Sequence, residues 1–164
     1  MTATNCSVRA LRRGDAGAVR AILEATGWEE QHVRAAVQNA EYYAAQPEGH
    51  AAFVATVDDS DDAVVVGFIF VELHVWNMLA QIQGLALHPD WRKQGRAAAL
   101  VAHAEAFARS QNARGVYVDT PTANLGGCAF YVACAYNAAY VMPRYYADHE
   151  DGVTFQKFFA PSGA

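Results

Sequence analysis

Residues 82–98 read IQGLALHPDWRKQGRAA, and this stretch decides the fold. Its beginning belongs to an apolar run from Gln81 to His88 that is typical of a β-strand and ends at Pro89. From Gly95 to Asn112 apolar residues return every three or four positions, which predicts an amphipathic helix. The stretch therefore predicts a strand, a short basic loop and a helix in succession.

The loop between this strand and helix has the chemistry of an anion site. A helix start presents unpaired backbone N–H groups and the positive end of the helix dipole, and such an end binds phosphate. Gly95 allows a close backbone approach, Ala97 keeps the first turn small, and Arg92, Lys93 and Arg96 add positive charge. A diphosphate cradle and an ordinary loop with surface cations both fit these residues.

Periodicity and turn residues predict the remaining elements. A helix is expected to open at Gly14-Asp15 with Asp15 as its cap, and Gly115 is expected to stop the helix that starts at Gly95. A second helical region is predicted over Glu29 to Gln46, and a short helix over Asn124 to Ala133. The predicted strands are Val8–Leu11, Ala51–Val57, Ala63–His74, Gly115–Asp119, Ala138–Met142 and Val153–Phe159.

The order of these elements predicts an α/β fold. Strand, helix and strand in the middle of the chain imply a parallel crossover, while the other strands can pair antiparallel through short loops. We therefore expect a mixed, twisted sheet of about seven strands with helices on both faces. A chain of 164 residues fits a single domain, 1–164.

Composition narrows the function classes. The chain is 53% hydrophobic and has a formal net charge of −5, so it can fill a core and is a poor candidate for a nucleic-acid partner. The longest apolar run, Val64 to Val71, is too short to cross a bilayer, so no membrane partner is expected. Three cysteines without a CxxC pair fit a reducing compartment, and six scattered histidines offer no metal-ligand spacing. We expect a cytoplasmic protein without a metal.

Three motifs in order resemble the GNAT acetyltransferase superfamily. Arg92-x-x-Gly95-x-Ala97 matches the family's Arg/Gln-x-x-Gly-x-Gly/Ala signature, and the strand before it, Gly84 to Pro89, is also similar. Asn124, Phe130-Tyr131 and Ala135-Tyr136 resemble the later Asn…Phe-Tyr…Gly-Phe pattern, with Ala135 and Tyr136 replacing the usual glycine and phenylalanine. The specific match covers about the second half of the chain. The first half agrees in element order alone.

The resemblance implies acetyl-CoA as cosubstrate and a GNAT-like fold. It places the pyrophosphate on backbone amides from Gln94 to Ala98, and the pantetheine arm along Leu85, Ala86 and Leu87 of a bulged strand. The N–H of Leu87 would stabilise the oxyanion of the acetyl carbonyl. Asn124 would help to hold the coenzyme arm. The implied cofactor-binding residues are Leu85, Ala86, Leu87, Arg92, Lys93, Gln94, Gly95, Arg96, Ala97, Ala98, Asn124 and Tyr131.

The resemblance also implies a general acid. Tyr131 would stand near the thioester sulfur, where a phenol can protonate the leaving thiolate. The structural alternative is an aromatic core residue on a short helix, as we expect for Phe130 beside it.

The general base is where the sequence departs from the family. Many members carry a Glu at the position of Gln83, and an amide cannot take a proton. An amine with a pKa of about 10 is mostly ammonium at neutral pH, so a proton must be removed before attack. Glu72 is the candidate we prefer as catalytic base, with His74 and Asp119 as alternatives. A water chain or an acceptor of low pKa would need no dedicated base.

The acceptor is expected to be a primary amine of a small molecule. In this family the first two helices and the nearby loops build the acceptor pocket, and aromatic rings with carboxylates suit a cationic amine. The residues in question are Trp28, Glu29, Glu30, His32, Tyr42, Tyr43 and Trp76. The alternatives are a protein acceptor, either an N-terminus or a lysine, and a non-catalytic acyl-CoA-binding sensor. The aromatic last strand suggests a homodimer edge.

Overall fold

The computed structural model describes residues 6–58, 62–147 and 149–161. The chain divides into two compact units. The first comprises Met1–Glu72 and Gln83–Phe107, and the second comprises Leu73–Ile82 and Ala108–Ala164. The seven described strands form a mixed sheet in the order β1-β2-β3-β4-β5-β7-β6, as expected for an α/β fold.

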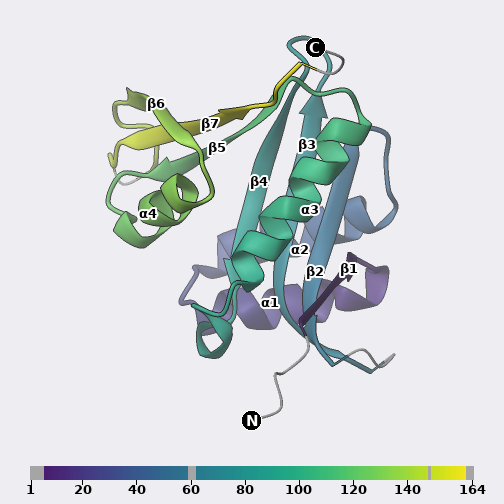
Figure 1. Ribbon diagram of the computed structural model, residues 1–164. Helices are drawn as coiled ribbons and strands as arrows, with labels where there is room; N and C mark the ends of the chain where they lie inside the picture. The colour runs from purple at the N-terminus through teal and green to yellow at the C-terminus, as the bar shows by residue number, and fades with distance from the viewer. Residues whose placement is uncertain (1–5, 59–61, 148, 162–164) are drawn as a thin grey trace. The chain divides into compact units, whose positions relative to one another are not determined.

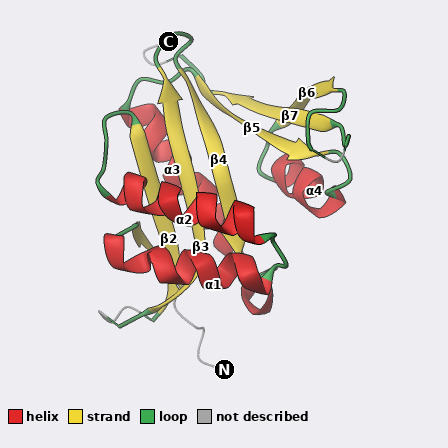
Figure 2. Ribbon diagram, turned by 180° about the vertical axis from the view of Figure 1, so that it is seen from behind, coloured by secondary structure: helices red, strands yellow, loops and turns green. Residues whose placement is uncertain are grey.

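The first unit is a sheet covered by helices on both faces. Figures 1 and 2 show α3 on one face of β2, β3 and β4, and α1 and α2 on the other. β1 pairs antiparallel with β2, and β2 with β3. The elements that lie wholly or mostly in this unit are β1 (Cys6–Ala10), α1 (Ala16–Ala25), α2 (Glu30–Ala44), β2 (His50–Val57), β3 (Val64–His74), β4 (Leu79–Leu87) and α3 (Arg96–Ser110), with short 3-10 turns at Arg13–Asp15 and Pro89–Trp91.

The second unit holds the ends of β3 and β4 and the C-terminal elements. These are β5 (Gly115–Pro121), α4 (Leu125–Ala133), β6 (Asn137–Met142) and β7 (Gly152–Phe158). β5 runs parallel to β4, which confirms the predicted crossover, and β7 pairs antiparallel with both β5 and β6. The parallel pairing of β4 with β5 joins three residue pairs, from Leu79–Gly115 to Gln81–Tyr117.

Two residues that were predicted to begin and end helices, Asp15 and Gly115, have other roles. Asp15 does not cap α1 with its side chain. Its carboxylate instead accepts hydrogen bonds from Arg12 N at 2.7 Å and from both terminal nitrogens of Arg9. Burial opposes the charge of Asp15, but the hydrogen bonds and charges of the two arginines outweigh it and lower the pKa of Asp15.

Gly115 does not end α3 as predicted, because Asn112 takes that role. Asn112 has φ 59°, and Ala113 N donates to Ala108 O at 2.9 Å, as in a Schellman-type stop. Gly115 begins β5, where a Cβ would lie 2.5 Å from Lys157 O of β7. The glycine is therefore required by close strand pairing.

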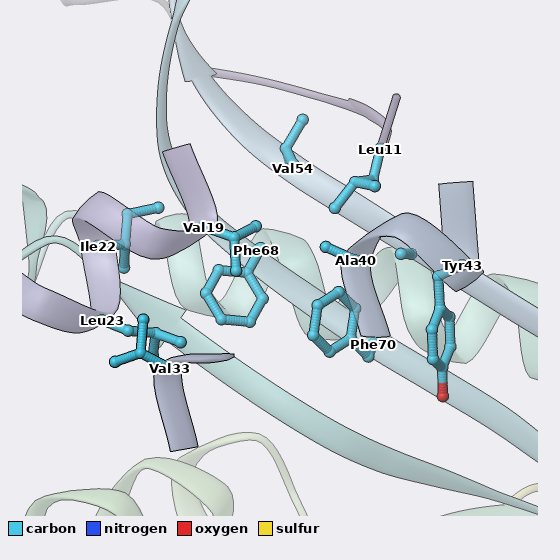
Figure 3. Close-up of a cluster of buried hydrophobic side chains, with 11 residues drawn as sticks. Leu11, Val19, Ile22, Leu23, Val33, Ala40, Tyr43, Val54, Phe68 and Phe70 are labelled. Atoms are coloured by element: carbon cyan, nitrogen blue, oxygen red, sulfur yellow. The ribbon is translucent and has the colours of Figure 1, made fainter. Parts of the chain in front are cut away.

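The core of the first unit lies between the sheet and the α1–α2 layer. Figure 3 shows Phe68 of β3 beside Val19 and Leu23 of α1, and Phe70 beside Ala40 and Tyr43 of α2. Burying a side chain of this size contributes about 1.5–3 kcal/mol. The full cluster is Leu11, Val19, Ile22, Leu23, Val33, Ala40, Tyr43, Ala52, Val54, Phe68 and Phe70.

The opposite face holds a close contact between β3 and β4. A Cβ on Gly67 would lie 2.2 Å from Leu87 Cδ2 and 3.1 Å from Ala86 O. Leu87 is 8% exposed, and His88 N donates to Val66 O at 2.8 Å directly after it. Gly67 therefore leaves the space that Leu87 fills, and this contact fixes the end of β4.

We expect Gly67→Ala to lower the free energy of unfolding by about 1–3 kcal/mol, because the added methyl overpacks the Leu87 contact. Urea unfolding followed by circular dichroism measures the change. Gly17→Ala is the control, since nothing lies within 4 Å of a Cβ there and the site is in α1. This control should gain roughly 0.5–1 kcal/mol. Equal stability of Gly67→Ala and the parent would contradict the contact.

Candidate active site

The loop between β4 and α3 turns sharply in the first unit. Pro89–Trp91 forms a 3-10 turn, and the His88 side chain accepts a hydrogen bond from Asp90 N at 3.3 Å. Lys93 and Gly95 then have φ values of 59° and 77°. Backbone that alternates between ordinary and positive φ values can turn its N–H groups towards one side, an arrangement that favours anions.

Helix α3 begins directly at the end of this loop. Ala99 N donates to Gly95 O at 3.1 Å, so the N–H groups of Arg96, Ala97 and Ala98 precede the helix ladder. The first turn contains no acidic residue that would occupy them. A Cβ on Gly95 would have no described heavy atom within 4 Å, so the helix start opens on free space.

Arg96 is buried in this loop without a carboxylate. It is 2% exposed, its guanidinium lies 4.9 Å from the Trp91 ring centroid, and one terminal nitrogen donates to Gln94 Oε1. No described residue bonds its Nε, the one such buried side-chain atom in the described part of the chain. A buried guanidinium with one N–H group left without an acceptor favours a nearby anion. The sequence pattern placed Arg96 among the surface cations with Arg92 and Lys93, which are exposed.

β4 is the edge strand of the first unit. Ala86 packs against the core cluster and Leu87 over Gly67, so these two side chains point to opposite faces. The backbone of Leu85, Ala86 and Leu87 therefore presents a strand edge away from β3. Arg92 Nε donates to Leu87 O at 3.4 Å and ties the loop to the strand end.

Two residues of β4 contact β3 through side chains near the predicted site. Gln83 Nε2 donates to Glu72 Oε2 at 3.1 Å, while a Cβ on Gly84 would lie 3.3 Å from the Phe70 ring. The bulge that the family resemblance implies in this strand stays a prediction.

The preferred base candidate, Glu72, lies beside His50 of β2 and Gln83. His50 Nε2 is 3.5 Å from Glu72 Oε1, and the two residues are directly paired across β2 and β3. His74, the second candidate, lies in the other unit and bonds Gln81 Oε1 at 3.0 Å. The sequence pattern does not reveal His50, because only strand register places it beside Glu72.

Tyr131 lies on α4 in the second unit and is 6% exposed. Its ring stacks on Phe155 at 5.8 Å and meets Tyr136 edge-on at 5.8 Å. Burial, with smaller contributions from Cys134 and Tyr146, raises the pKa of Tyr131 well above its usual range. No hydrogen bond of its hydroxyl to a described residue is present. The environment combines the packing of a core aromatic with a hydroxyl that keeps its proton.

The third base candidate, Asp119 of β5, is engaged within the second unit. Its oxygens accept hydrogen bonds from Thr154 Oγ1 at 2.6 Å and from the Tyr145 hydroxyl at 3.2 Å. Burial and then the charge of Asp119 raise the pKa of Tyr146 to about 12. The sequence pattern does not connect these residues, which belong to β5, β7 and the loop after β6.

Asn124 has a structural role in the second unit. Its Oδ1 accepts a hydrogen bond from Gly127 N at 3.0 Å and caps α4, the helix that carries Tyr131. Its Nδ2 lies 3.4 Å from Thr120 Oγ1. Contact with the coenzyme arm stays a prediction for this residue.

Two further observations bear on the site. Within the described ranges, no group of three or more His, Cys, Asp or Glu side chains could hold a metal ion. No helix among the described residues is long and apolar enough to span a membrane.

Comparison with known proteins places the chain in a family. The family model of the acetyltransferase (GNAT) family matches residues 19–136, which is more than half of the chain. The protein therefore belongs to the GNAT acetyltransferase family, whose members use acetyl-CoA, and it is an acyltransferase. None of the curated protein sequences matches it.

Solved structures share its fold. It is similar to a protein from Desulfovibrio desulfuricans described as a GNAT acetyltransferase, with 20% identity, TM-score 0.83, and coverage of 95% of this chain and 100% of that one. It is also similar to the ribosomal-protein-S18-alanine N-acetyltransferase from Escherichia coli, with 18% identity, TM-score 0.73, and coverage of 98% of this chain and 99% of that one. A third similar structure is a protein from Bacillus anthracis described as a streptothricin acetyltransferase, in complex with acetyl coenzyme A. The identity is 22%, the TM-score 0.64, and the coverage 73% of this chain and 67% of that one.

We expect Asn124→Ala to lower the free energy of unfolding by about 1 kcal/mol, because the Gly127 N–H loses its cap, while Asn124→Ser keeps most of that stability. Thermal unfolding of both variants measures the difference. Asn39→Ala, at an exposed position of α2, should leave stability within about 0.5 kcal/mol. An equal loss in Asn124→Ser would contradict the capping role.

Proposed function

We propose that the protein transfers an acetyl group from acetyl-CoA to a primary amine of a small molecule, by direct attack of the amine in a ternary complex. The observation that carries this proposal is the buried, unpaired Nε of Arg96 at the start of α3. A diphosphate would satisfy it, together with the N–H groups of the first helical turn. The neighbouring Lys93 and Arg92 add charge that suits the same group.

Each proposed residue has one task. The amides from Gln94 to Ala98 hold the diphosphate, and the edge of β4 from Leu85 to Leu87 binds the pantetheine amides as an added strand would. The N–H of Leu87 stabilises the oxyanion, and the hydroxyl of Tyr131 gives its proton to the departing sulfur. Acetyl-CoA supplies an activated thioester carbonyl. The high pKa of Tyr131 suits an acid that must hold its proton until the thiolate forms.

Two exposed aromatic rings, one just before α2 and one near its C-terminal end, support a small cationic acceptor. Trp28 is 51% exposed and Tyr42 54% exposed, and both belong to the first unit. Ring faces of this kind attract ammonium groups. Glu30 is less available than expected, because it pairs with Arg20 at 3.1 Å and with Arg34 at 3.8 Å.

The second candidate acceptor is the N-terminal amine of a protein. It is favoured by the likeness to the Escherichia coli enzyme, which covers nearly the whole of both chains, whereas the likeness to the streptothricin enzyme covers about two thirds of that chain. Thiol release measured with spermidine, an alanine-initiated peptide and the same peptide with a blocked N-terminus separates the two acceptors. Reaction of the free peptide alone would replace the small-molecule proposal.

We expect the protein to bind acetyl-CoA in the micromolar range and Gly95→Glu to weaken binding at least about 100-fold, because a carboxylate would face the diphosphate. Calorimetric titration measures both dissociation constants. Gly17→Glu is the matched control, since it adds the same charge at an exposed position in α1 and should bind like the parent. Failure of the folded parent to bind, or equal binding by Gly95→Glu, would remove the proposal.

We expect Tyr131→Phe to lower kcat about 100- to 10,000-fold with the dissociation constant of acetyl-CoA within about twofold, because only proton transfer is lost. Thiol release and calorimetry give the two quantities. Burial raises the pKa of the hydroxyl above the ordinary value of about 10, so Tyr131 stays protonated below that pH and causes no alkaline loss of activity there. Unchanged turnover in the variant would assign Tyr131 to the core alone.

A further inference from the structure

Three polar side chains meet on neighbouring strands of the first unit. Glu72 of β3 accepts a hydrogen bond from Gln83 Nε2 of β4 at one oxygen, and its other oxygen lies 3.5 Å from His50 Nε2 of β2. The side chains of His50 and Glu72 are 19% and 30% exposed, so both are sheltered and still reached by solvent. The carboxylate that a GNAT enzyme commonly carries at the position of Gln83 is thus present one strand away.

The hydrogen bonds of His50 determine its tautomer. His50 Nδ1 lies 2.8 Å from Glu48 O, and because a carbonyl oxygen can only accept, Nδ1 must carry the hydrogen. In the neutral ring Nε2 is then a lone pair that faces Glu72 Oε1. Two acceptors oppose each other until a proton arrives between them, when they form a charge-assisted hydrogen bond. The geometry of the pair therefore leaves a place for one shared proton between His50 Nε2 and Glu72 Oε1.

No other described group near the pair competes for this proton. No described lysine or arginine pairs with Glu72, so no fixed cation neutralises it. The rings of Tyr42 and Tyr43 from α2 meet His50 at 5.3 Å and are the other ionisable groups described beside it. Burial, and then the charge of Glu72, raise the pKa of Tyr43 well above its usual range, so Tyr43 stays neutral.

We propose that the His50–Glu72 pair is the general base of the acetyl transfer and that Gln83 is a positioning residue that holds the Glu72 carboxylate; this rests on the function proposed above. The acceptor ammonium gives one proton to the lone pair of His50 Nε2, which shares it with Glu72. The amine lone pair then adds to the acetyl carbonyl and forms the C–N bond, and the resulting oxyanion collapses as the C–S bond breaks. The thiolate takes the proton that the proposed function assigns to Tyr131, and the second proton of the new amide nitrogen replaces it, so one proton is released per turnover.

The test compares pH profiles of kcat/KM for the parent, Glu72→Gln and His50→Gln, with spermidine and the alanine-initiated peptide as acceptor probes. Loss of a general base costs about 100- to 10,000-fold. We expect a loss in this range at pH 7 that shrinks as pH rises towards the pKa of the amine, because the free amine then forms unaided. A structural role would give a loss that is the same at every pH.

A second substitution tests rescue. Glu72→Gln combined with Gln83→Glu returns a carboxylate to the same place from β4 and should recover at least about 10-fold of the lost kcat/KM. Glu41→Gln, at an exposed position of α2, is the matched control and should behave like the parent. Calorimetry with acetyl-CoA should give the same dissociation constant for Glu72→Gln and the parent. If the parent does not bind acetyl-CoA, the proposed function is wrong. If the parent binds and turns over, and Glu72→Gln has the same pH profile of kcat/KM as the parent, only the assignment of the general base is wrong.

Nitrogen NMR of the histidine rings tests the pair without any acceptor. We expect neutral His50 to carry its hydrogen on Nδ1, as the bond to Glu48 O requires. The Nε2–H tautomer would overturn the proposal, because His50 would then donate to Glu72 and have no lone pair for the ammonium proton.

Discussion

The contact of Leu87 with Gly67 is the constraint on which the first unit depends. It holds the end of β4 against β3 at the point where the chain leaves the sheet, and the bond from His88 N to Val66 O follows directly. The loop that follows must then turn within a few residues, which it does through the positive φ values of Lys93 and Gly95. Helix α3 begins at a defined place because the strand before it is fixed. A loop of the same composition on a loose strand would be an ordinary basic turn.

The two proton transfers proposed above are assigned to groups of opposite character. Tyr131 is nearly fully buried among rings, which favours the neutral form of a phenol. The His50–Glu72 pair is partly open to solvent and contains a carboxylate that no described cation neutralises. Burial suits a group that must keep its proton, and a histidine–carboxylate pair that solvent reaches suits one that must exchange it. The chemistry therefore follows from how much water each group meets.

Sequence patterns predicted the elements better than their details. The seven strands and four helices follow from periodicity, because one buried face imposes it on each element. The roles of Asp15 and Gly115 were wrong, since each depends on a partner far along the chain or in a neighbouring turn: Arg9 for Asp15 and Lys157 for Gly115. The local sequence pattern does not predict which residues these partners are.

The candidate site divides in the same way. The cradle residues from Arg92 to Ala98 were predicted, because strand, glycine and helix start are adjacent in sequence. The burial of Arg96 was not, since its position over Trp91 depends on how the loop folds back. His50 could not be found either, because only the register of β2 against β3 brings it to Glu72.

The buried guanidinium of Arg96 also has a thermodynamic meaning. Enclosing a cation without an acceptor for every N–H group costs free energy that a bound anion returns. A ligand that binds only the folded state adds RT ln(1 + [L]/Kd), about 2.7 kcal/mol at 100 times its dissociation constant. A chain of this size has a total stability of roughly 5–15 kcal/mol. With the proposed diphosphate bound at Arg96, the folded fraction of the enzyme would rise with the concentration of the acetyl donor.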